Sequence, residues 1–249
     1  MQLYFIRHGQ STNNANWDDN IEKYDRTSDP QLTDLGVYQA QALAGFVASN
    51  QTSSNDNENG GENRNNISFT HLYSSLMIRA IQTGTILSET LDIPLFGLPE
   101  AHEIGGIYLE TLVDGIPQIS NEFGVTPTFL REHYPALKLH DRIPEKGWWQ
   151  GGIEPVTAPL LRAKAVLNLL KERHLGTNDM VAVVTHGGFF NTMARAIFHI
   201  RPDESDNRNL STWFAYCNCA VSRFDFVNDR VVWVYHNRTD FMKDELLTC

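Results

Sequence analysis

Short apolar runs alternate along the chain with longer segments in which apolar residues recur every three or four positions. The short runs predict buried strands, and the periodic segments predict helices that turn one face toward a core. The predicted strands cover 2–6, 69–73 and 180–184, and the predicted helices cover 35–47, 76–91, 160–175 and 188–199. Strands that alternate with helices predict an α/β fold with three layers, α/β/α, and a mostly parallel central sheet.

Turn-forming and polar residues mark where several elements end. The polar run 9–20 follows the first strand and predicts a loop, and Thr33 is a suitable N-cap for the helix that comes next. Near the end of the chain, 212–226 and 230–235 alternate between apolar and polar residues, with Asn228 in the turn between them. This alternation predicts two strands joined by a short connection.

Two segments interrupt the pattern without dividing the chain. The residues from about 50 to 66 are mostly Asn, Ser, Glu and Gly, which predicts a mobile low-complexity insertion. The segment at about 98–155 is irregular and rich in Gly, Pro and aromatic residues, as expected of a cap that controls specificity. Trp148 and Trp149 either line this cap or pack in its core. The chain, 1–249, is therefore predicted to form a single domain.

The chain carries 30 acidic and 20 basic side chains, a formal net charge of −10 with histidine neutral. This balance argues against a nucleic-acid binder that covers phosphates with Lys and Arg. It leaves room for a small phosphorylated substrate, because the local field of a pocket can oppose the net charge. No window holds the roughly 18 uninterrupted apolar residues of a membrane helix, so we expect no membrane partner.

The amino terminus and the cysteines favour the cytoplasm. Residues 1–6 carry no basic leader and no apolar stretch long enough for a signal peptide. Cys217, Cys219 and Cys249 form an odd and sparse set, from which we expect no disulfide framework and no zinc site. On a strand, Cys217 and Cys219 would face the same side and pack in the core. The sequence thus predicts a soluble cytoplasmic protein.

Two histidines follow predicted strands in matching settings, and a glycine follows each of them. His8 comes directly after the strand at 2–6, and His186 comes just after the strand at 180–184. In open α/β sheets, ligands bind beyond the carboxyl ends of the strands. If these two strands are neighbours in the sheet, both imidazoles lie over one crevice.

Two arginines also lie at or just after the ends of predicted strands. Arg7 ends the first strand, and Arg79 lies in the first turn of a helix, where a cation opposes the helix dipole. Both side chains need an anionic partner if they are buried, and the guanidinium fork suits phosphate oxygens. The sequence contains no GxxxxGK[ST], GxGxxG or HExxH motif and no acidic cluster, so we expect neither a nucleotide cofactor nor a metal.

Four short segments carry the motifs of one enzyme family in order along the chain. They are 7–14 (RHGQSTNN), 32–40 (LTDLGVYQA), 74–83 (SSLMIRAIQT) and 185–188 (THGG). They resemble the RHGxSxxN, LTxxGxxQA, SSxxxRAxQT and second-histidine motifs of the histidine phosphatase superfamily, the phosphoglycerate mutase-like proteins. The resemblance implies the phosphoglycerate mutase-like α/β/α fold, and it fades through 50–66 and 104–155.

The resemblance also implies a role for each matched residue. His8 is the nucleophile, which attacks phosphorus to form a phosphohistidine. Cationic and polar groups hold the phosphoryl oxygens and offset the charge of the transition state, with the second histidine among the catalytic residues. By this resemblance the residues that contact the phosphoryl group are Arg7, Asn14, Arg79, His186 and Gly187, the last through close approach of its backbone.

The general acid is expected after the third strand, where the family carries a pattern like ExxxGxxEG. Glu103 is the candidate and Glu110 matches the second Glu, although Ile107 and Thr111 replace the two glycines. Glu100 is the alternative. A carboxyl that protonates a leaving alkoxide near neutral pH needs a raised pKa, which burial can supply.

Three functions stay open at this point, and the leading one requires no cofactor. The leading hypothesis is a metal-independent phosphomonoesterase of the phosphatase branch, which hydrolyses a small phosphorylated metabolite through a phosphohistidine. It is favoured because 102–105 lacks the NERHYG stretch that the mutases carry around the acid. The alternatives are phosphoglycerate mutase-type phosphoryl transfer and a catalytically inactive binding protein of the same fold. The sequence indicates neither the substrate nor the oligomeric state.

Overall fold

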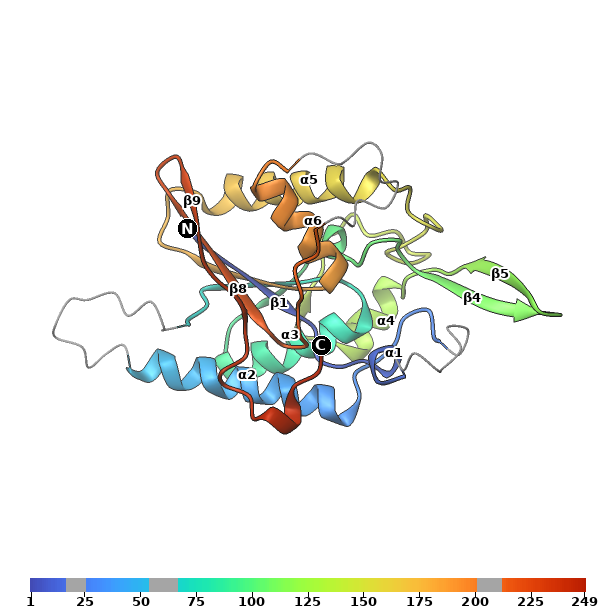
Figure 1. Ribbon diagram of the computed structural model, residues 1–249, viewed down its shortest axis with the longest axis horizontal. Coiled ribbons are helices and arrows are strands. Elements are labelled where there is room, and N and C mark those ends of the chain that lie inside the picture. The colour runs from blue at the N-terminus through green and yellow to red at the C-terminus, as the bar shows by residue number, and fades with distance from the viewer. Residues whose placement is uncertain (17–25, 54–66, 201–211) are drawn as a thin grey trace.

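A seven-stranded sheet forms the centre of the computed structural model, which describes residues 1–16, 26–53, 67–200 and 212–249 (Figure 1). Its strand order is β6-β3-β2-β7-β1-β8-β9. The strands are β1 (Gln2–Arg7), β2 (His71–Ser74), β3 (Leu95–Gly97), β6 (Leu137–Lys138), β7 (Met180–Thr185), β8 (Val221–Val227) and β9 (Arg230–Arg238). All neighbouring pairs from β6 to β1 are parallel, whereas β8 and β9 pair antiparallel at one edge. The predicted mostly parallel α/β sheet is thereby confirmed.

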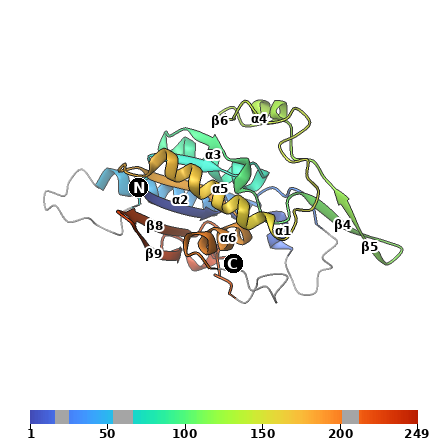
Figure 2. The same ribbon diagram turned by 90° about the horizontal axis from the view of Figure 1, so that it is seen from above.

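Four long helices cover the two faces of this sheet, as Figures 1 and 2 show. They are α2 (Asp34–Ser53) and α3 (Ile78–Leu91) on one face, and α5 (Ala158–His174) and α6 (Gly187–Ile197) on the other. Tyr4 and Ile6 of β1 join the apolar core under α2 and α3. Leu3 and Phe5, which alternate with them along the strand, join the core under α5 and α6. This alternation produces the three predicted layers.

The polar run after β1 is not wholly the predicted loop, because the short helix α1 (Thr12–Ala15) forms in it. The Ser11 hydroxyl accepts the backbone N–H of Asn14 at 3.3 Å, and the Asn14 side-chain oxygen accepts the backbone N–H of Ser11 at 3.1 Å. This reciprocal pair is a capping box in which Asn takes the place of Glu or Gln. The substitution hid the helix start from the sequence pattern. Positions 17–20 of the predicted loop lie outside the described residues.

The helix α2 begins as predicted and ends later than predicted. The Thr33 hydroxyl accepts the backbone N–H of Gly36 at 3.0 Å, which caps the first turn. The helix continues through Ser53, since its last polar residues include neither Gly nor Pro to stop it. Positions 54–66 of the predicted insertion lie outside the described residues, so its mobility stays a prediction.

The segment 98–155 holds more regular structure than its irregular pattern predicted. It forms the turn η1 (Pro99–Ala101), the projecting hairpin β4–β5 (Tyr108–Val113 and Ile116–Asn121), the helix α4 (Pro127–His133) and the edge strand β6 (Figure 2). The hairpin turns at Asp114 and Gly115, with φ of 52° and 76°. Asp-Gly is a strong signal for such a two-residue turn, and the sequence reading overlooked it. Trp148 and Trp149 pack, with ring centroids 5.6 and 4.6 Å from that of His102.

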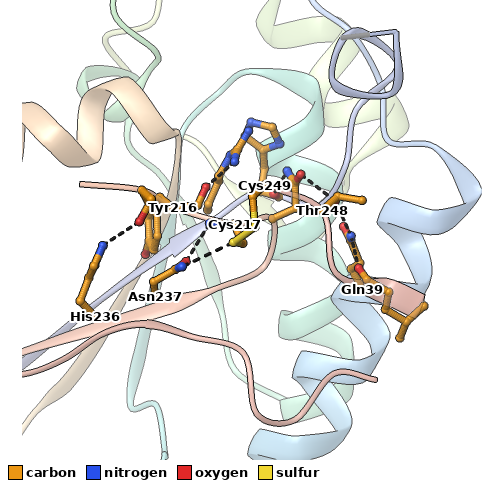
Figure 3. Close-up of a disulfide and its surroundings, with 12 residues drawn as sticks. Gln39, Tyr216, Cys217, His236, Asn237, Thr248 and Cys249 are labelled. Carbon is orange, nitrogen blue, oxygen red and sulfur yellow. Dashed lines mark hydrogen bonds between the residues drawn. A yellow bond between two sulfur atoms is a disulfide. The ribbon is translucent and has the colours of Figure 1, made fainter. Parts of the chain in front are cut away.

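The end of the chain corrects two predictions. The strand expected from residue 212 begins only at Val221, after a segment that turns at Cys219 with φ of 55°. The expected absence of a disulfide is also wrong, because Cys217 and Cys249 form one (Figure 3). They are 32 positions apart and meet only through the fold, so their spacing carried no signal. Cys219 is buried and free.

The disulfide removes one of the arguments for the cytoplasm, which stays a prediction. A separate observation concerns the membrane. None of the helices in the described part of the chain is both long enough and apolar enough to cross a bilayer.

Candidate active site

A cavity of ≈ 340 Å³ lies beyond the carboxyl end of β1. Its lining includes five of the predicted site residues, namely Arg7, His8, Asn14, Arg79 and Glu103. The strands β1 and β7 are parallel neighbours in which Arg7 pairs with Thr185, so His8 and His186 leave the sheet side by side. Their ring centroids lie 5.1 Å apart. The structure therefore brings the two histidines together, as expected if their strands are adjacent.

The His8 imidazole is buried and held in one tautomer. Its Nδ1 lies 2.7 Å from the carbonyl oxygen of Gly9, to which it can only donate, and its Nε2 accepts the Nε–H of Arg79 at 3.0 Å. Burial, then Arg79 and then Arg7, hold the pKa of His8 well below its usual value. The ring is thus neutral near pH 7, and the hydrogen bond from Arg79 occupies its Nε2 lone pair until Arg79 donates to another acceptor. A nucleophile toward phosphorus requires that lone pair.

The His186 imidazole is completely buried, and one of its nitrogens has no partner. Its Nε2 lies 2.9 Å from the Ser75 hydroxyl, which also accepts the backbone N–H of Met77 at 3.2 Å. When the hydroxyl donates to Nε2, the ring proton sits on Nδ1, for which the described residues supply no hydrogen-bond partner. Burial, then Arg79 and His8, hold the pKa of His186 well below its usual value.

Arg79 is buried and Arg7 is half-buried, and the hydrogen bonding of Arg7 is incomplete. Arg7 donates through Nη1 to the carbonyl oxygen of Tyr216, but its buried Nε has no partner among the described residues. Burial lowers the pKa of both guanidiniums, and the nearby Glu103 carboxylate opposes this effect. A buried polar group without a partner costs about 1–3 kcal/mol, so the site gains free energy when an anion satisfies it.

Asp29 is a member of the site that the sequence analysis missed. Its carboxylate oxygen Oδ1 lies 3.7 Å from Nη1 of Arg79 and accepts the backbone N–H of Ile78 at 3.0 Å. It therefore supplies an anion at the start of α3, which resolves the conflict between Arg79 and the helix dipole. Burial raises the pKa of Asp29 to about 6. A lone Asp in a polar loop, 50 positions from the arginine, gave no pattern to detect it.

The two candidate acids lie in different places. The Glu103 carboxylate accepts the backbone N–H groups of Phe189 at 2.8 Å and Gly188 at 3.2 Å, at the start of α6, and that of Ile104 at 2.8 Å. It lines the same cavity as His8. Glu100 instead lines a separate and larger cavity of ≈ 840 Å³, on the side of α5. The geometry favours Glu103 for contact with a substrate at His8.

Two further residues were predicted to contact a phosphoryl group, and of these Asn14 lines the cavity whereas Gly187 does not. The side-chain oxygen of Asn14 is bound by Ser11 and, at 3.4 Å, by Nδ2 of Asn218. Its amide NH₂ is therefore the group it can offer to a ligand in the cavity. Gly187 begins α6, and a Cβ atom there would lie 3.8 Å from the unpartnered Nε of Arg7. The backbone N–H groups at a helix start suit an anion.

Two of the matched motifs hold the loop that carries His8. A Cβ at Gly9 would lie 2.4 Å from the carbonyl oxygen of Gly36, and a Cβ at Gly36 would lie 2.1 Å from that of Gln10. Only glycine fits at both contacts. The Gln39 side-chain oxygen accepts the backbone N–H of Gln10 at 2.7 Å, and the Thr83 hydroxyl accepts that of Gly9 at 3.0 Å. The motif residues thus position the loop at His8 through backbone contacts.

One group of side chains in the described residues could hold a metal ion, and it lies away from this cavity. Potential ligand atoms of His71, His174 and Asp179 lie within 4.8 Å of one another, at the amino ends of β2 and β7. Both ring nitrogens of His174 already have partners, since Nδ1 lies 2.8 Å from Asp179 and Nε2 lies 3.0 Å from the Tyr73 hydroxyl. The cluster is thus satisfied by hydrogen bonds.

Comparison with known proteins agrees with the motifs. A family model described as the histidine phosphatase superfamily, branch 1, matches residues 3–55 and 58–239. No curated protein sequence matches the chain significantly.

Several solved structures share the fold. A mutant phosphoserine phosphatase from Entamoeba histolytica, in complex with phosphoserine, has 17% identity and a TM-score of 0.56, covering 97% of this chain and 99% of its own. A mycobacterial glucosyl-3-phosphoglycerate phosphatase in complex with VO3 has 18% identity and a TM-score of 0.55, covering 96% and 99%. The ecdysone phosphate phosphatase from Bombix mori, in complex with tungstate, has 16% identity and a TM-score of 0.57, covering 93% and 91%. The likeness confirms the phosphoglycerate mutase-like fold.

Proposed function

Because the chain belongs to the histidine phosphatase superfamily, we propose that it is a metal-independent phosphomonoesterase that acts on a small phosphorylated metabolite through a phosphohistidine. One observation carries this proposal. A neutral His8 lies among two buried nitrogens that have no partner in the described residues, Nε of Arg7 and Nδ1 of His186, and the second is a donor when the Ser75 hydroxyl donates to Nε2 of His186. The oxygens of a phosphoryl group would satisfy both donors while phosphorus faces the nucleophile.

In the first proposed step, the Nε2 lone pair of His8 attacks phosphorus. The N–P bond forms as the bond from phosphorus to the ester oxygen breaks, and the proton of the Glu103 carboxyl passes to the leaving alkoxide. The guanidiniums of Arg7 and Arg79 offset the charge that builds on the equatorial oxygens.

In the second step, water attacks the phosphohistidine. The Glu103 carboxylate takes one proton from the water, the new P–O bond forms, and the N–P bond breaks to return the lone pair to His8. Release of inorganic phosphate restores the starting state. The hydrogen bond from Nδ1 to the Gly9 carbonyl keeps the ring oriented through both steps.

The cavity supports a substrate of modest size. Its volume of ≈ 340 Å³ is near the lower end of typical ligand sites, which span about 300–1,000 Å³. Apolar side chains beyond the phosphoryl site, those of Met77, Ile104, Tyr108 and Leu109, line part of its wall. The structural relatives named above are phosphatases of phosphoserine, a glucosyl phosphoglycerate and ecdysone phosphate, which differ widely in their organic part. We therefore propose the phosphomonoester class rather than one compound.

The test is a phosphate-release screen on sugar phosphates, phosphoglycerates, nucleotides and phosphopeptides, followed by acid quench to trap phosphate on the protein. The wild type should release phosphate and carry acid-labile phosphate, and His8→Ala should do neither. His133→Ala, at an exposed histidine on α4, serves as the matched control and should match the wild type.

The screen also separates the two other functions. Interconversion of 3- and 2-phosphoglycerate that depends on a bisphosphate primer, with little phosphate release, would favour a mutase. Failure to release phosphate from any substrate, together with no phosphate trapped on His8, would refute an enzyme of this mechanism and favour a binding protein.

A further inference from the structure

The segment 216–219, just before β8, lies directly against the strand end that carries the nucleophile. The Tyr216 carbonyl accepts Nη1 of Arg7, and the Cys219 backbone N–H donates to the Arg7 carbonyl at 3.0 Å. The Asn218 side chain donates through Nδ2 to the His8 carbonyl at 2.9 Å. This segment therefore determines where Arg7 and His8 lie relative to the cavity.

Asn218 contacts two predicted site residues through its side chain. Its side chain is 1% exposed, and Nδ2 also reaches the Asn14 side-chain oxygen at 3.4 Å. On its other side, Oδ1 accepts the Thr248 hydroxyl at 3.0 Å, and the Asn218 backbone N–H donates to the Thr248 carbonyl at 2.8 Å. The carboxamide thus joins two predicted site residues to Thr248.

Thr248 belongs to the segment 246–249, which also contacts the loop after His8 through Gln39, as Figure 3 shows in part. The Gln39 amide nitrogen donates to the Leu246 carbonyl at 2.6 Å and to the Thr248 hydroxyl at 2.8 Å. Its side-chain oxygen accepts the backbone N–H of Gln10, two positions after the nucleophile, at 2.7 Å. Residues 246–249 therefore bridge the loop after His8 and the segment behind it.

The disulfide makes this bridge covalent at one end (Figure 3). Cys217 is buried and fixed by Asn237, whose Oδ1 accepts the Cys217 backbone N–H at 2.7 Å and whose Nδ2 lies 3.4 Å from Sγ. Cys249 is exposed and adjacent to Thr248. While the S–S bond exists, Thr248 cannot move far from Asn218.

We infer that Asn218 is a positioning residue of the phosphoryl site, and that the Cys217–Cys249 disulfide holds it in place through Thr248, so that phosphate binding and turnover depend on the redox state of this pair. The inference rests on the proposed function for its activity readout only. It adds a residue and a control element that no matched motif contains.

The redox step requires an external dithiol, such as dithiothreitol. One of its thiolates attacks Sγ of the exposed Cys249, the S–S bond breaks, and Cys217 leaves as a thiolate. The second dithiol sulfur then displaces Cys249 from the mixed disulfide. Two electrons and two protons pass to the cysteine pair, and the dithiol is oxidised to a cyclic disulfide. A two-electron oxidant such as oxidised glutathione reverses the step.

The first experiment compares oxidised and reduced wild type, with free thiols counted in each. Reduction should lower kcat/KM for the best phosphomonoester of the screen by about tenfold to a hundredfold, the cost of misplacing a catalytic group by roughly 1 Å. It should also weaken binding of inorganic phosphate, measured by calorimetry. Circular dichroism and a thermal melt of the reduced protein verify that it remains folded.

Variants locate the effect. Cys249→Ser should have the low activity of the reduced protein and no response to dithiothreitol, whereas Cys219→Ala, at the buried free cysteine, should respond as the wild type does. Asn218→Ala should lose activity, and reduction should add little to that loss, since both changes remove the same contact. A role in general stability alone would instead make the two losses multiply.

Three results would overturn the inference. The first is a count of three free thiols in protein purified under oxidising conditions. The second is equal phosphate affinity and activity in the two redox states. The third is that the activity losses caused by Asn218→Ala and by reduction are fully additive in free energy. If even the oxidised protein hydrolyses no phosphomonoester, the proposed function fails by itself. The phosphate affinity of the two redox states then still tests the coupling.

Discussion

Asp29 is a buried carboxyl whose replacement by asparagine tests the electrostatics of the site. Its Oδ1 accepts the backbone N–H of Ile78 and faces Arg79, while its buried Oδ2 has no partner in the described residues. Asparagine keeps the shape and the acceptor at Oδ1, removes the charge, and places an NH₂ group where Oδ2 was. Asp29→Asn is expected to raise the free energy of unfolding of the unliganded protein more at pH 8 than at pH 4.

The magnitude follows from the pKa of Asp29, which burial raises from 3.8 to about 6. The folded state holds this proton more tightly than the unfolded state, so the stability of the wild type falls as the pH rises from about 4 to 6. At about 1.4 kcal/mol for each tenfold change in proton affinity, the full penalty above pH 6 is about 3 kcal/mol. About 2 kcal/mol of it separates pH 4 from pH 8.

The assay is urea unfolding of wild type and Asp29→Asn at pH 4, 6 and 8, followed by tryptophan fluorescence and circular dichroism. The difference between the two proteins should grow by about 2 kcal/mol from pH 4 to pH 8 in favour of asparagine. Asp141→Asn, at an exposed carboxyl, should change stability by less than about 0.5 kcal/mol at either pH. A difference that is constant with pH, or that shrinks as the pH rises, would refute the reasoning.

Two further predictions concern the glycine contact and the acid. Gly36→Ala should cost about 3 kcal/mol or more of unfolding free energy in a thermal melt, because its Cβ would lie 2.1 Å from the Gln10 carbonyl. Gly45→Ala, which meets nothing within 4 Å in the helix α2, should instead stabilise by about 0.5–1 kcal/mol, and equal melts would contradict the steric argument. Glu103→Gln should lower kcat by about 10²–10⁴-fold with KM little changed, while Glu100→Gln leaves kcat unchanged; the reverse result would transfer the acid role.

The strand ends were the part of the site most accessible to sequence reasoning. Each of two short apolar runs predicts where a strand stops and which side chain comes next. Arg7 and His8 stand at the end of the first run, and His186 follows the second. In a parallel sheet these ends share one edge, so adjacency of β1 and β7 was the only further condition. The helical spacing of the apolar residues around Arg79 likewise placed that residue in the first turn of a helix. Local periodicity therefore placed each of these residues on its element, and the pairing of the strands brought them together.

Residues that act through distant partners gave no such signal. Asp29 meets Arg79 from a polar loop, and Asn218 reaches the His8 carbonyl from 210 positions away. In the sequence both are ordinary polar residues of loops, because the atoms that they bind are brought near them only by the fold. The β4–β5 hairpin is a different case, since its Asp-Gly turn was visible in the sequence and was overlooked.

The sequence by itself determined the α/β alternation and the order of the motifs, because each depends on periodicity or on neighbouring residues. The tertiary structure alone decided the tautomer of His8, the anion beside Arg79 and the pairing of Cys217 with Cys249. These depend on distances between atoms far apart in the chain, and a hydrogen bond or an S–S bond exists only within a few ångströms.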